Sequence, residues 1–395
     1  MTLPPLKLRK NEDRRLRAGH LWVFSNEVDV EATPLTAFEP GTLVEIQAHD
    51  GRAVGTGYVN PRSLICARLL SRDPAHPAGP SLLVHRLKVA LALRERIYGA
   101  PYYRLVFGEG DGLPGLVVDR YGDVLVAQLT TAGMERLKDD VVAALIKVLK
   151  PAGILFRNDA PVRELEGLER YVAIAHGTVP ERVTVEEDGL VFEVALQEGQ
   201  KTGWFYDQRD NRARLARYVR GRRVLDVFSY VGAWGVRAAA AGAAEVLCVD
   251  SSTAALELAR ANAARNGVAL GTVEDDAFEA LRRLREARER FDVVIVDPPA
   301  FIKRRRDHRE GLKAYHGLNR LAMQVLARDG LLVSCSCSQH LARAELHDVI
   351  LREARHLERT VGITEQGGQG PDHPVHPAIP ETEYLKVVFA RVLPA

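Results

Sequence analysis

The stretch Val224-Leu-Asp-Val-Phe-Ser-Tyr-Val-Gly-Ala-Trp-Gly235 constrains the fold of this chain more than any other segment. Its apolar start predicts a β-strand that ends in Asp226, and the glycines that follow allow a tight turn into a helix. From about residue 190 onward, apolar runs of strand length alternate with amphipathic runs of helix length. Repeated strand–helix units predict a parallel, doubly wound α/β sheet. Strands are expected at 190–196, 223–228, 245–250, 268–274, 291–296, 330–336 and 384–391, with helices at about 207–220, 233–241, 252–266, 277–289, 310–328 and 341–356.

Two smaller parts precede this sheet. Residues 1–72 predict a β-rich domain, because short apolar strands such as 41–47 and 53–59 alternate with turn signals. A Pro-rich linker follows, and residues 73–188 then combine an amphipathic helix at 81–99 with several strands and a second helix, which predicts an α+β domain. We therefore expect three domains, at 1–72, 73–188 and 189–395.

The composition excludes several classes of protein. A hydrophobic share of 46% and a charged share of 27% are ordinary for a soluble globular protein. No apolar run reaches membrane-spanning length and nothing resembles a signal peptide, so no membrane partner is expected. The four cysteines are too few for a disulfide framework, and no Cys/His set has zinc spacing, so no metal site is expected. A reducing cytoplasm fits this cysteine usage best.

Acidic residues at two successive strand ends predict a nucleotide-like cofactor site. Asp226 ends one strand, and Asp250, followed by Ser251, ends the next strand 24 residues later. A carboxylate at the second position can accept hydrogen bonds from ribose hydroxyls. The bulky residues 228–231 before Gly232 depart from the G-x-G-x-x-G pattern of dinucleotide sites, which must cradle a pyrophosphate. S-adenosylmethionine carries no phosphate, and its cationic groups favour a carboxylate at Asp226, so we expect this cofactor rather than NAD.

Two further positions extend this site. Asp276 and Ala277 follow the next strand, where a carboxylate or a backbone amide could meet the adenine amino group. For Asp276, a helix N-cap is a nearly equal alternative, because aspartate commonly fills that position.

Later strand ends carry groups suited to methyl transfer to a pyrimidine. Asp297-Pro298-Pro299 ends one strand, and Cys335 and Cys337 lie near the end of the following one. A cysteine thiolate that adds to carbon 6 of cytosine makes carbon 5 nucleophilic enough to accept a methyl group. Asp297 could hold N3 and the exocyclic amine of the base. Cys337 is the candidate nucleophile because it lies nearer the carboxyl end of its strand, whereas Cys335 and Cys248 are expected to be buried apolar residues.

These motifs together resemble the three-domain bacterial ribosomal RNA (cytosine-C5) methyltransferases of the large subunit. The resemblance implies an N-terminal PUA-like domain, an α+β middle domain and a C-terminal Rossmann-like class I methyltransferase domain. It also implies formation of 5-methylcytosine in ribosomal RNA or the large ribosomal subunit. The motifs that carry it are Leu16-Arg-Ala-Gly-His-Leu-Trp-Val-Phe-Ser-Asn26, Glu109-Gly-Asp-Gly-Leu-Pro-Gly-Leu-Val-Val-Asp-Arg-Tyr121, Gln200-Lys-Thr-Gly-Trp-Phe-Tyr-Asp-Gln-Arg-Asp-Asn-Arg212, Asp297-Pro-Pro-Ala-Phe301 and Ser336-Cys-Ser338.

The resemblance also implies roles for individual residues. Cys337 would be the nucleophile, and the cofactor or base site would be lined by Lys201, Thr202, Asp226, Phe228, Asp250, Asp276 and Asp297. Better-known RNA cytosine-C5 enzymes carry a second cysteine where this chain has Pro299. Product release would then use another group, or Cys335 would assist. The PUA-like part would bind RNA, with candidates Arg17, His20 and Trp22.

A basic cluster after the Asp-Pro-Pro motif predicts a contact with RNA phosphates. Its residues are Lys303, Arg304, Arg305 and Arg306, although the net charge of the chain is only +2. The basic run from 209 to 223 fits a salt-bridged helical surface about equally well. Two alternatives to the cytosine reaction stay open: methylation of an exocyclic amine (N6 of adenine or N2 of guanine), and a non-catalytic RNA-binding assembly factor. The residues also leave open whether the chain forms a homodimer.

Overall fold

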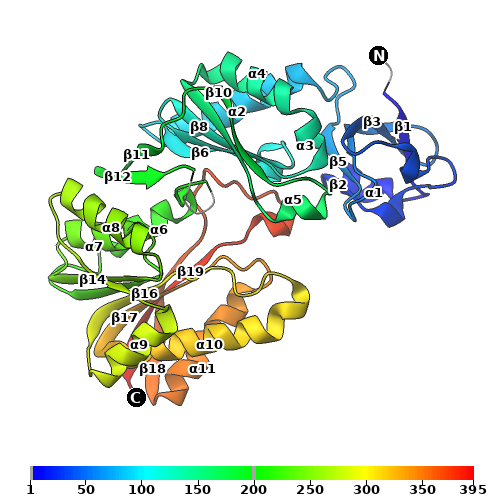
Figure 1. The fold of residues 1–395 in the computed structure, drawn as a ribbon. Coiled ribbons are helices and arrows are strands. Elements are labelled where there is room, and N and C mark those ends of the chain that lie inside the picture. Colours follow the sequence, from blue (N-terminus) through cyan, green and yellow to red (C-terminus); the bar gives the residue numbers. More distant parts are fainter. Residues whose placement is uncertain (1–2, 198–201) are drawn as a thin grey trace. The chain divides into compact units, whose positions relative to one another are not determined.

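A computed structural model describes residues 3–197 and 202–395 of the chain (Figure 1). The chain divides into two compact units. Unit 1 contains Met1–Val183, Ala195–Trp204 and Pro371–Thr382. Unit 2 contains Thr184–Val194, Phe205–Gly370 and Glu383–Ala395. Each unit therefore receives segments that are distant in the sequence.

The N-terminal part of unit 1 is a five-stranded sheet with the order β1-β3-β4-β5-β2. Its first strand pairs in parallel with β3, and the other pairs are antiparallel. Buried aliphatic side chains such as Leu6, Val44 and Leu69 form its core. The elements are β1 (Pro5–Lys7), α1 (Asp13–Arg17), β2 (Trp22–Val23), β3 (Thr42–Gln47), β4 (Ala53–Val59) and β5 (Ala67–Ser71), with single 3-10 turns at Ser25–Glu27 and Leu35–Ala37.

The rest of unit 1 is a second five-stranded sheet, with the order β10-β9-β8-β7-β6. Helices α2 and α4 pack their apolar faces on it, through residues such as Leu87 and Leu145. Tyr58 of the first sheet lies in this second core, and its hydroxyl donates to the carbonyl of Pro114 at 2.8 Å. The elements are α2 (Pro80–Ile97), β6 (Tyr102–Phe107), a 3-10 turn (Gly108–Asp111), β7 (Leu116–Tyr121), β8 (Val124–Leu129), α3 (Ala132–Arg136), α4 (Lys138–Leu149), β9 (Gly153–Asn158), α5 (Val162–Leu165) and β10 (Tyr171–Gly177).

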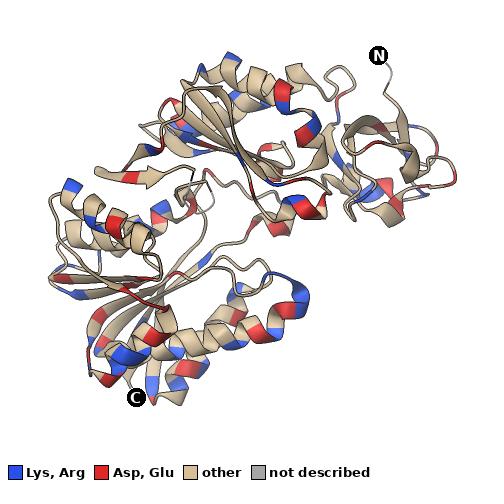
Figure 2. Cartoon of the chain, viewed as in Figure 1, with Lys and Arg blue, Asp and Glu red and all other residues tan. Residues whose placement is uncertain are grey.

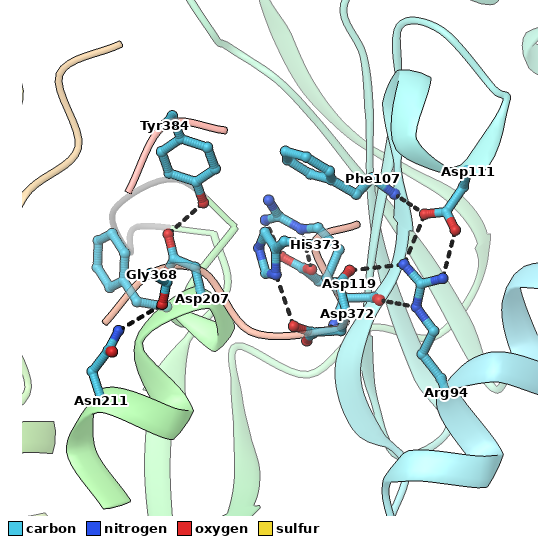
Figure 3. A network of polar contacts seen from close by, with 12 residues as sticks. Arg94, Phe107, Asp111, Asp119, Asp207, Asn211, Gly368, Asp372, His373 and Tyr384 are labelled. Carbon is cyan, nitrogen blue, oxygen red and sulfur yellow. Dashed lines mark hydrogen bonds and ion pairs between the residues drawn. The ribbon is translucent and has the colours of Figure 1, made fainter. Parts of the chain in front are cut away.

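The segment Pro371–Thr382 completes unit 1 through a buried polar network (Figure 3). The carbonyl of Asp372 accepts from Arg94 at 2.7 Å, and its carboxylate accepts from the backbone N–H of Arg104 at 2.9 Å. His373 places Nδ1 2.8 Å from the same carboxylate and its ring 5.1 Å from that of Phe107. The loop 367–374, whose role the sequence did not reveal, thus contributes buried residues to this unit.

Unit 2 is built on a seven-stranded sheet with the order β15-β14-β13-β16-β17-β19-β18. The first five strands are parallel, as the sequence predicts, but β19 is antiparallel to both β17 and β18. The prediction of a wholly parallel sheet is therefore wrong at this end. The strands are β13 (Arg223–Val227), β14 (Glu245–Asp250), β15 (Gly271–Glu274), β16 (Phe291–Val296), β17 (Leu326–Ser336), β18 (Arg359–Gly367) and β19 (Lys386–Pro394).

Two strand predictions in this region need correction. The segment near 190 forms β12 (Leu190–Ala195), which pairs with β11 (Arg182–Glu187) in a two-stranded sheet that, among the described residues, is separate from the large one. The strand β18 was not predicted, because its exposed, largely polar sequence at the sheet edge lacks the apolar pattern of a buried strand.

Helices cover both faces of the large sheet (Figure 1). Leu215, Trp234 and Leu256 of α6, α7 and α8 pack on one face, and α9, α10 and α11 cover the other. The helices are α6 (Arg209–Leu215), α7 (Ala233–Ala240), α8 (Thr253–Arg265), α9 (Ala277–Glu286), α10 (His308–Val325) and α11 (Arg343–His356), with 3-10 turns at Tyr206–Gln208, Arg305–Asp307 and Pro380–Thr382. Within residues 3–197 and 202–395, every helix is too short or too polar to span a bilayer.

Candidate functional site

The turn between β13 and α7 has an unusual backbone. Phe228, Tyr230 and Gly232 all have positive φ angles, of 66°, 49° and 78°. Such angles cost about 1–3 kcal/mol for residues other than glycine and persist only where the surroundings enforce them. Here the backbone N–H groups of Phe228 and Ser229 both donate to the carbonyl of Val249 at 3.0 Å. The turn is therefore fixed against the neighbouring strand β14.

Asp226 lies beneath this turn and is fully buried. Its Oδ2 accepts from the backbone N–H of Gly235 at 3.0 Å, while its Oδ1 has no hydrogen-bond partner among the described residues. Burial raises the pKa of Asp226 to about 7, and the negative charges of Asp297 and Asp250 act in the same direction. The carboxyl group thus holds the first turn of α7, and its direct contact with a cofactor stays a prediction.

The next strand end presents a more accessible carboxylate. Asp250, half-buried, accepts from the backbone N–H groups of Tyr230 at 2.8 Å and Ser252 at 3.0 Å, and Ser251 beside it is exposed. Further along the edge, Asp276 caps α9 by accepting from the N–H groups of two residues in its first turn. Asp276 is therefore the N-cap of α9, which is the alternative that the sequence left open. The next residue, Ala277, is buried.

Asp297 is held at the carboxyl end of β16 by two side chains. Its Oδ2 accepts from Nε1 of Trp234 at 3.1 Å and from Nε2 of Gln208 at 3.0 Å. Its backbone N–H donates to the carbonyl of Val227 at 3.3 Å. Since β13 and β16 are neighbouring parallel strands, Asp297 and the 228–232 turn lie at the same edge of the sheet.

Cys337 follows directly after β17, the next parallel strand. Its Sγ lies 3.9 Å from the carbonyl oxygen of Pro298, and the residue is half-buried among the side chains that pack with Trp234. The adjacent Ser338 is buried, and its hydroxyl accepts from the N–H of Ile302 at 3.1 Å and contacts the hydroxyl of Tyr315 at 2.9 Å. The thiol therefore lies near the backbone of Pro298, the residue that follows Asp297.

The other three cysteines are buried. Burial raises the pKa of Cys335 and Cys248 well above the ordinary value, and nearby carboxylates act in the same direction. Burial also raises the pKa of Cys66 to about 12. A thiol with a raised pKa is a poor source of thiolate. Cys337 is thus the one cysteine that combines partial exposure with a place at the carboxyl edge of the sheet.

Two of the predicted cofactor residues are not among the described residues of unit 2. Lys201 falls outside the described residues. Thr202 belongs to unit 1, where its hydroxyl donates to the buried carboxylate of Asp119 at 2.5 Å and its carbonyl accepts from Tyr121.

Side chains in the N-terminal part of unit 1 that were predicted to bind RNA already have intramolecular partners. Trp22 donates from Nε1 to Glu109 at 2.8 Å, and His20 accepts from the backbone N–H of Trp22 at 3.0 Å. Arg17 is exposed and pairs with Asp13 at 2.5 Å. An RNA contact by Trp22 would therefore use the ring face rather than the indole N–H.

The basic cluster at residues 303–306 is exposed and lies just before α10. Figure 2 shows Lys and Arg in the connection that precedes this helix. The only ion pair of this cluster within the described ranges joins Arg306 to Asp307 at 3.8 Å. By contrast, the basic run from 209 to 223 includes structural pairs such as Arg212 with Glu187 and Arg223 with Glu245. Several residues of that run therefore form salt bridges within the protein, as the salt-bridged surface alternative predicts.

The sequence did not single out three residues that contact Asp297 or the segment around Cys337. Trp234 and Gln208 hold Asp297, and Lys386 donates to the carbonyl of Ser338 at 2.5 Å. A lysine inside the apolar run from Leu385 to Phe389 is the one signal that could have been noticed, because a charged residue is unexpected in a buried strand.

Comparison with known proteins supports the fold and the cofactor. A model of PUA-like domains matches residues 6–72, and a model of S-adenosylmethionine-dependent methyltransferases matches residues 172–383. A solved methyltransferase in complex with SAH has a TM-score of 0.84 and 22% identity, covering 98% of this chain and 100% of that one. A Streptococcus mutans protein described as a SAM-dependent methyltransferase has a TM-score of 0.82 and 22% identity, with the same coverage.

Curated relatives match over the whole length. The ribosomal RNA large subunit methyltransferase I of Shewanella frigidimarina is 38% identical over 395 residues, covering 98% of this chain and 99% of the relative. That of Aliivibrio fischeri is 38% identical over 394 residues, covering 98% of each protein. The predicted PUA-like and Rossmann-like domains and the predicted cofactor are thus confirmed. The chain belongs to the family of PUA-domain S-adenosylmethionine-dependent methyltransferases that includes the ribosomal RNA large subunit methyltransferases I.

Proposed function

We propose that this methyltransferase forms 5-methylcytosine in large-subunit ribosomal RNA through a covalent adduct between Cys337 and carbon 6 of the base. The observation that supports this best is the position of the Cys337 thiol, half-buried at the carboxyl edge of the sheet and 3.9 Å from the carbonyl oxygen of Pro298. Asp297 lies next to that proline and is fixed by two hydrogen bonds. A nucleophile and a base-holding carboxylate thus share one edge.

The residues that would hold the cofactor follow from the same edge. Asp250 and Ser251 are accessible beside the 228–232 turn, and their polar groups suit ribose hydroxyls. Phe228 and the backbone near Ala277 would flank the adenine. When bound, S-adenosylmethionine supplies an electrophilic methyl group. Asp226 would contribute by stabilising the 228–232 turn and the start of α7, because its Oδ2 accepts a hydrogen bond from the N–H of Gly235.

The reaction then follows from the chemistry of these residues. The Cys337 thiolate forms a bond to carbon 6 of cytosine, and the electron pair of the C5–C6 double bond moves into the ring, towards N3. Asp297 holds the amine edge of the base during this addition. Carbon 5 would then form a bond to the methyl group as the bond from that methyl to the sulfonium sulfur breaks and the demethylated cofactor leaves. The proton of carbon 5 passes to a base, and the returning electron pair expels the sulfur of Cys337 as thiolate.

The substrate is inferred from the relatives and from charge. The full-length relatives are named as ribosomal RNA large subunit methyltransferases. Residues 6–72 match a PUA-like domain, and the family resemblance implies that this domain binds RNA. The exposed basic cluster 303–306 supplies cations for phosphates close to the Asp297 loop. Such a substrate places the reaction in the cytoplasm, the compartment that the cysteine usage predicts.

The product of the reaction tests this proposal directly. Ribosomal RNA from cells that lack the gene would be incubated with the protein and isotopically labelled S-adenosylmethionine, then digested to nucleosides and separated by mass spectrometry. The expected labelled product is 5-methylcytidine, and bisulfite sequencing would locate it. A label found only in N6-methyladenosine or N2-methylguanosine would overturn the cytosine reaction, and no label would favour a non-catalytic role.

Replacing Gly235 with alanine is expected to weaken S-adenosylmethionine binding about tenfold, measured by titration calorimetry. A Cβ at this position would lie 2.5 Å from Sγ of Cys248 and 3.4 Å from Oδ2 of Asp226, so the turn must move. Gly362→Ala in β18 is the matched control, because its Cβ would meet nothing within 4 Å. Adding Cys248→Ala to Gly235→Ala should recover part of the affinity. Unchanged binding by Gly235→Ala would argue against this turn as the cofactor site.

Replacing the four residues 303–306 with glutamine is expected to weaken RNA binding and to lower its dependence on salt. Each lost phosphate contact removes about 0.7–0.9 from the slope of log K against log salt concentration. Filter-binding titrations over a range of salt would measure that slope. The control is Arg282→Gln with Arg285→Gln on α9, whose side chains pair with Glu279 and Glu286. A slope equal to that of the unmodified protein would exclude the cluster from the interface.

A further inference from the structure

Lys386 occupies an unusual position for a lysine. It is the first residue of β19 and pairs in register with Ser336, the last residue of β17. Only 5% of Lys386 is exposed, and its neighbours Leu385, Val387 and Val388 are buried in the core. A buried ammonium is costly unless it is paired or fully hydrogen-bonded. A group that balances the charge of the Lys386 ammonium is therefore expected nearby.

One contact of its ammonium group is with the residue that follows Cys337. Nζ donates to the carbonyl of Ser338, the residue after Cys337, at 2.5 Å and to the carbonyl of Tyr384 at 2.7 Å. An ammonium has three N–H donors, and within residues 3–197 and 202–395 the third has no hydrogen-bond or ion-pair partner. Neutral carbonyl groups thus satisfy two donors without balancing the charge.

Lys386 interacts electrostatically with Cys337, Arg343, Glu383 and Glu345, and Cys337 in turn interacts with Cys335 and Tyr315. Glu383 lies 3.9 Å from Arg343, and Glu345 caps α11 at the N–H of Ala342 and lies 2.9 Å from His308. Both carboxylates are therefore engaged by other groups. Burial lowers the pKa of Lys386 to about 8, and negative charge on Cys337 acts in the opposite direction. The thiol of Cys337 is thus the remaining group that can supply the balancing anion.

We infer that Lys386 is the positioning residue that maintains Cys337 as a thiolate. In this step the S–H bond of Cys337 breaks, its electron pair stays on sulfur, and the proton forms the third N–H bond of the Lys386 amine. The pair changes from neutral thiol and neutral amine to thiolate and ammonium, so its net charge is unchanged. The biological role of this pair rests on the proposed function, because the covalent step needs a thiolate at Cys337. The pair itself requires neither RNA nor cofactor.

The rate at which iodoacetamide alkylates Cys337, followed by peptide mass spectrometry over a range of pH, tests this inference. In the intact protein the midpoint should lie at least about one unit below the ordinary thiol value of about 8.5. Lys386→Met should raise the midpoint by about one unit or more and slow alkylation at neutral pH about tenfold, whereas Lys386→Arg should keep most of the shift. Lys313→Met on α10, which removes an exposed lysine paired with Glu310, is the matched control and should change nothing.

Two checks keep the test decisive. Circular dichroism and S-adenosylmethionine binding would establish that Lys386→Met folds, and a midpoint unchanged in a folded Lys386→Met protein would overturn the inference. If that variant does not fold, the ultraviolet thiolate absorbance of the unmodified protein minus that of Cys337→Ser gives the midpoint directly. A value at or above about 8.5 would also overturn it. A lowered midpoint without 5-methylcytidine formation would refute the proposed function alone.

Discussion

Cys337→Ala is expected to lower methyl transfer to RNA by at least about a thousandfold, because the proposed reaction has no other attacking group at this edge of the sheet. Binding of S-adenosylmethionine should change little. The side chain is half-buried, and its Sγ lies as far as 3.9 Å from the carbonyl oxygen of Pro298, so alanine removes little packing. Initial rates with labelled cofactor and calorimetry on the same preparation would measure both quantities.

Cys335→Ala is the matched control for this experiment. It removes a thiol from the same segment, but Cys335 is fully buried and its pKa is raised by burial and by Asp297. The variant should keep turnover within a few fold and should not accumulate covalent RNA. Trapped RNA in Cys335→Ala would instead show that this thiol assists product release. Full turnover by Cys337→Ala would remove the nucleophile from the proposed reaction and favour transfer to an exocyclic amine.

The part of the site that could be predicted from sequence lies on strand ends. Asp226, Asp297 and Cys337 follow apolar runs, and parallel strands bring their carboxyl ends to one edge. That reasoning needs only local patterns and one rule of topology. It could not show that Asp226 is fully buried, since the depth of a side chain depends on what packs against it, here Gly235 of α7 and Cys248 of β14.

The rest depends on contacts between segments that are far apart in the sequence. Lys386 reaches Ser338 only because β19 reverses direction beside β17, and the sequence pattern predicted a parallel strand there. Asp372 and His373 lie in a loop with many glycines and prolines, but they are buried in unit 1 by contacts with Arg94 and Phe107. Gly110 allows this loop to pack closely against it, because a Cβ at position 110 would lie 2.0 Å from the carbonyl oxygen of Pro374. One sequence carries no signal for such pairings.

The buried pair of Glu187 and Arg212 is another such contact, and it carries the largest expected effect on stability. The two side chains are 1% and 2% exposed, and their charged atoms approach to 2.6 Å. Arg212 also donates to the carbonyl of Phe205 at 3.0 Å. Burial alone would raise the pKa of Glu187, but the guanidinium of Arg212 and its hydrogen bonds outweigh burial and lower the pKa. The pair thus anchors the β11–β12 hairpin to α6 within unit 2.

Glu187→Gln is expected to reduce the free energy of unfolding by about 3–5 kcal/mol, because it leaves the Arg212 guanidinium buried without its counter-charge. Urea titration followed by tryptophan fluorescence would measure the change. Glu245→Gln is the matched control. It removes the same kind of charge from Arg223, but that pair is exposed, so the loss should stay below about 1 kcal/mol.

The pH dependence separates the ionic contribution from a packing defect. Because the pKa of Glu187 is lowered in the folded chain, its stabilisation is present above the ordinary glutamate value of about 4.3 and is lost as the pH falls below it. The stability difference between the unmodified protein and Glu187→Gln should therefore shrink on acidification below about 4.3. A difference that stays constant to lower pH would contradict the ionic explanation and point to altered packing around Arg212.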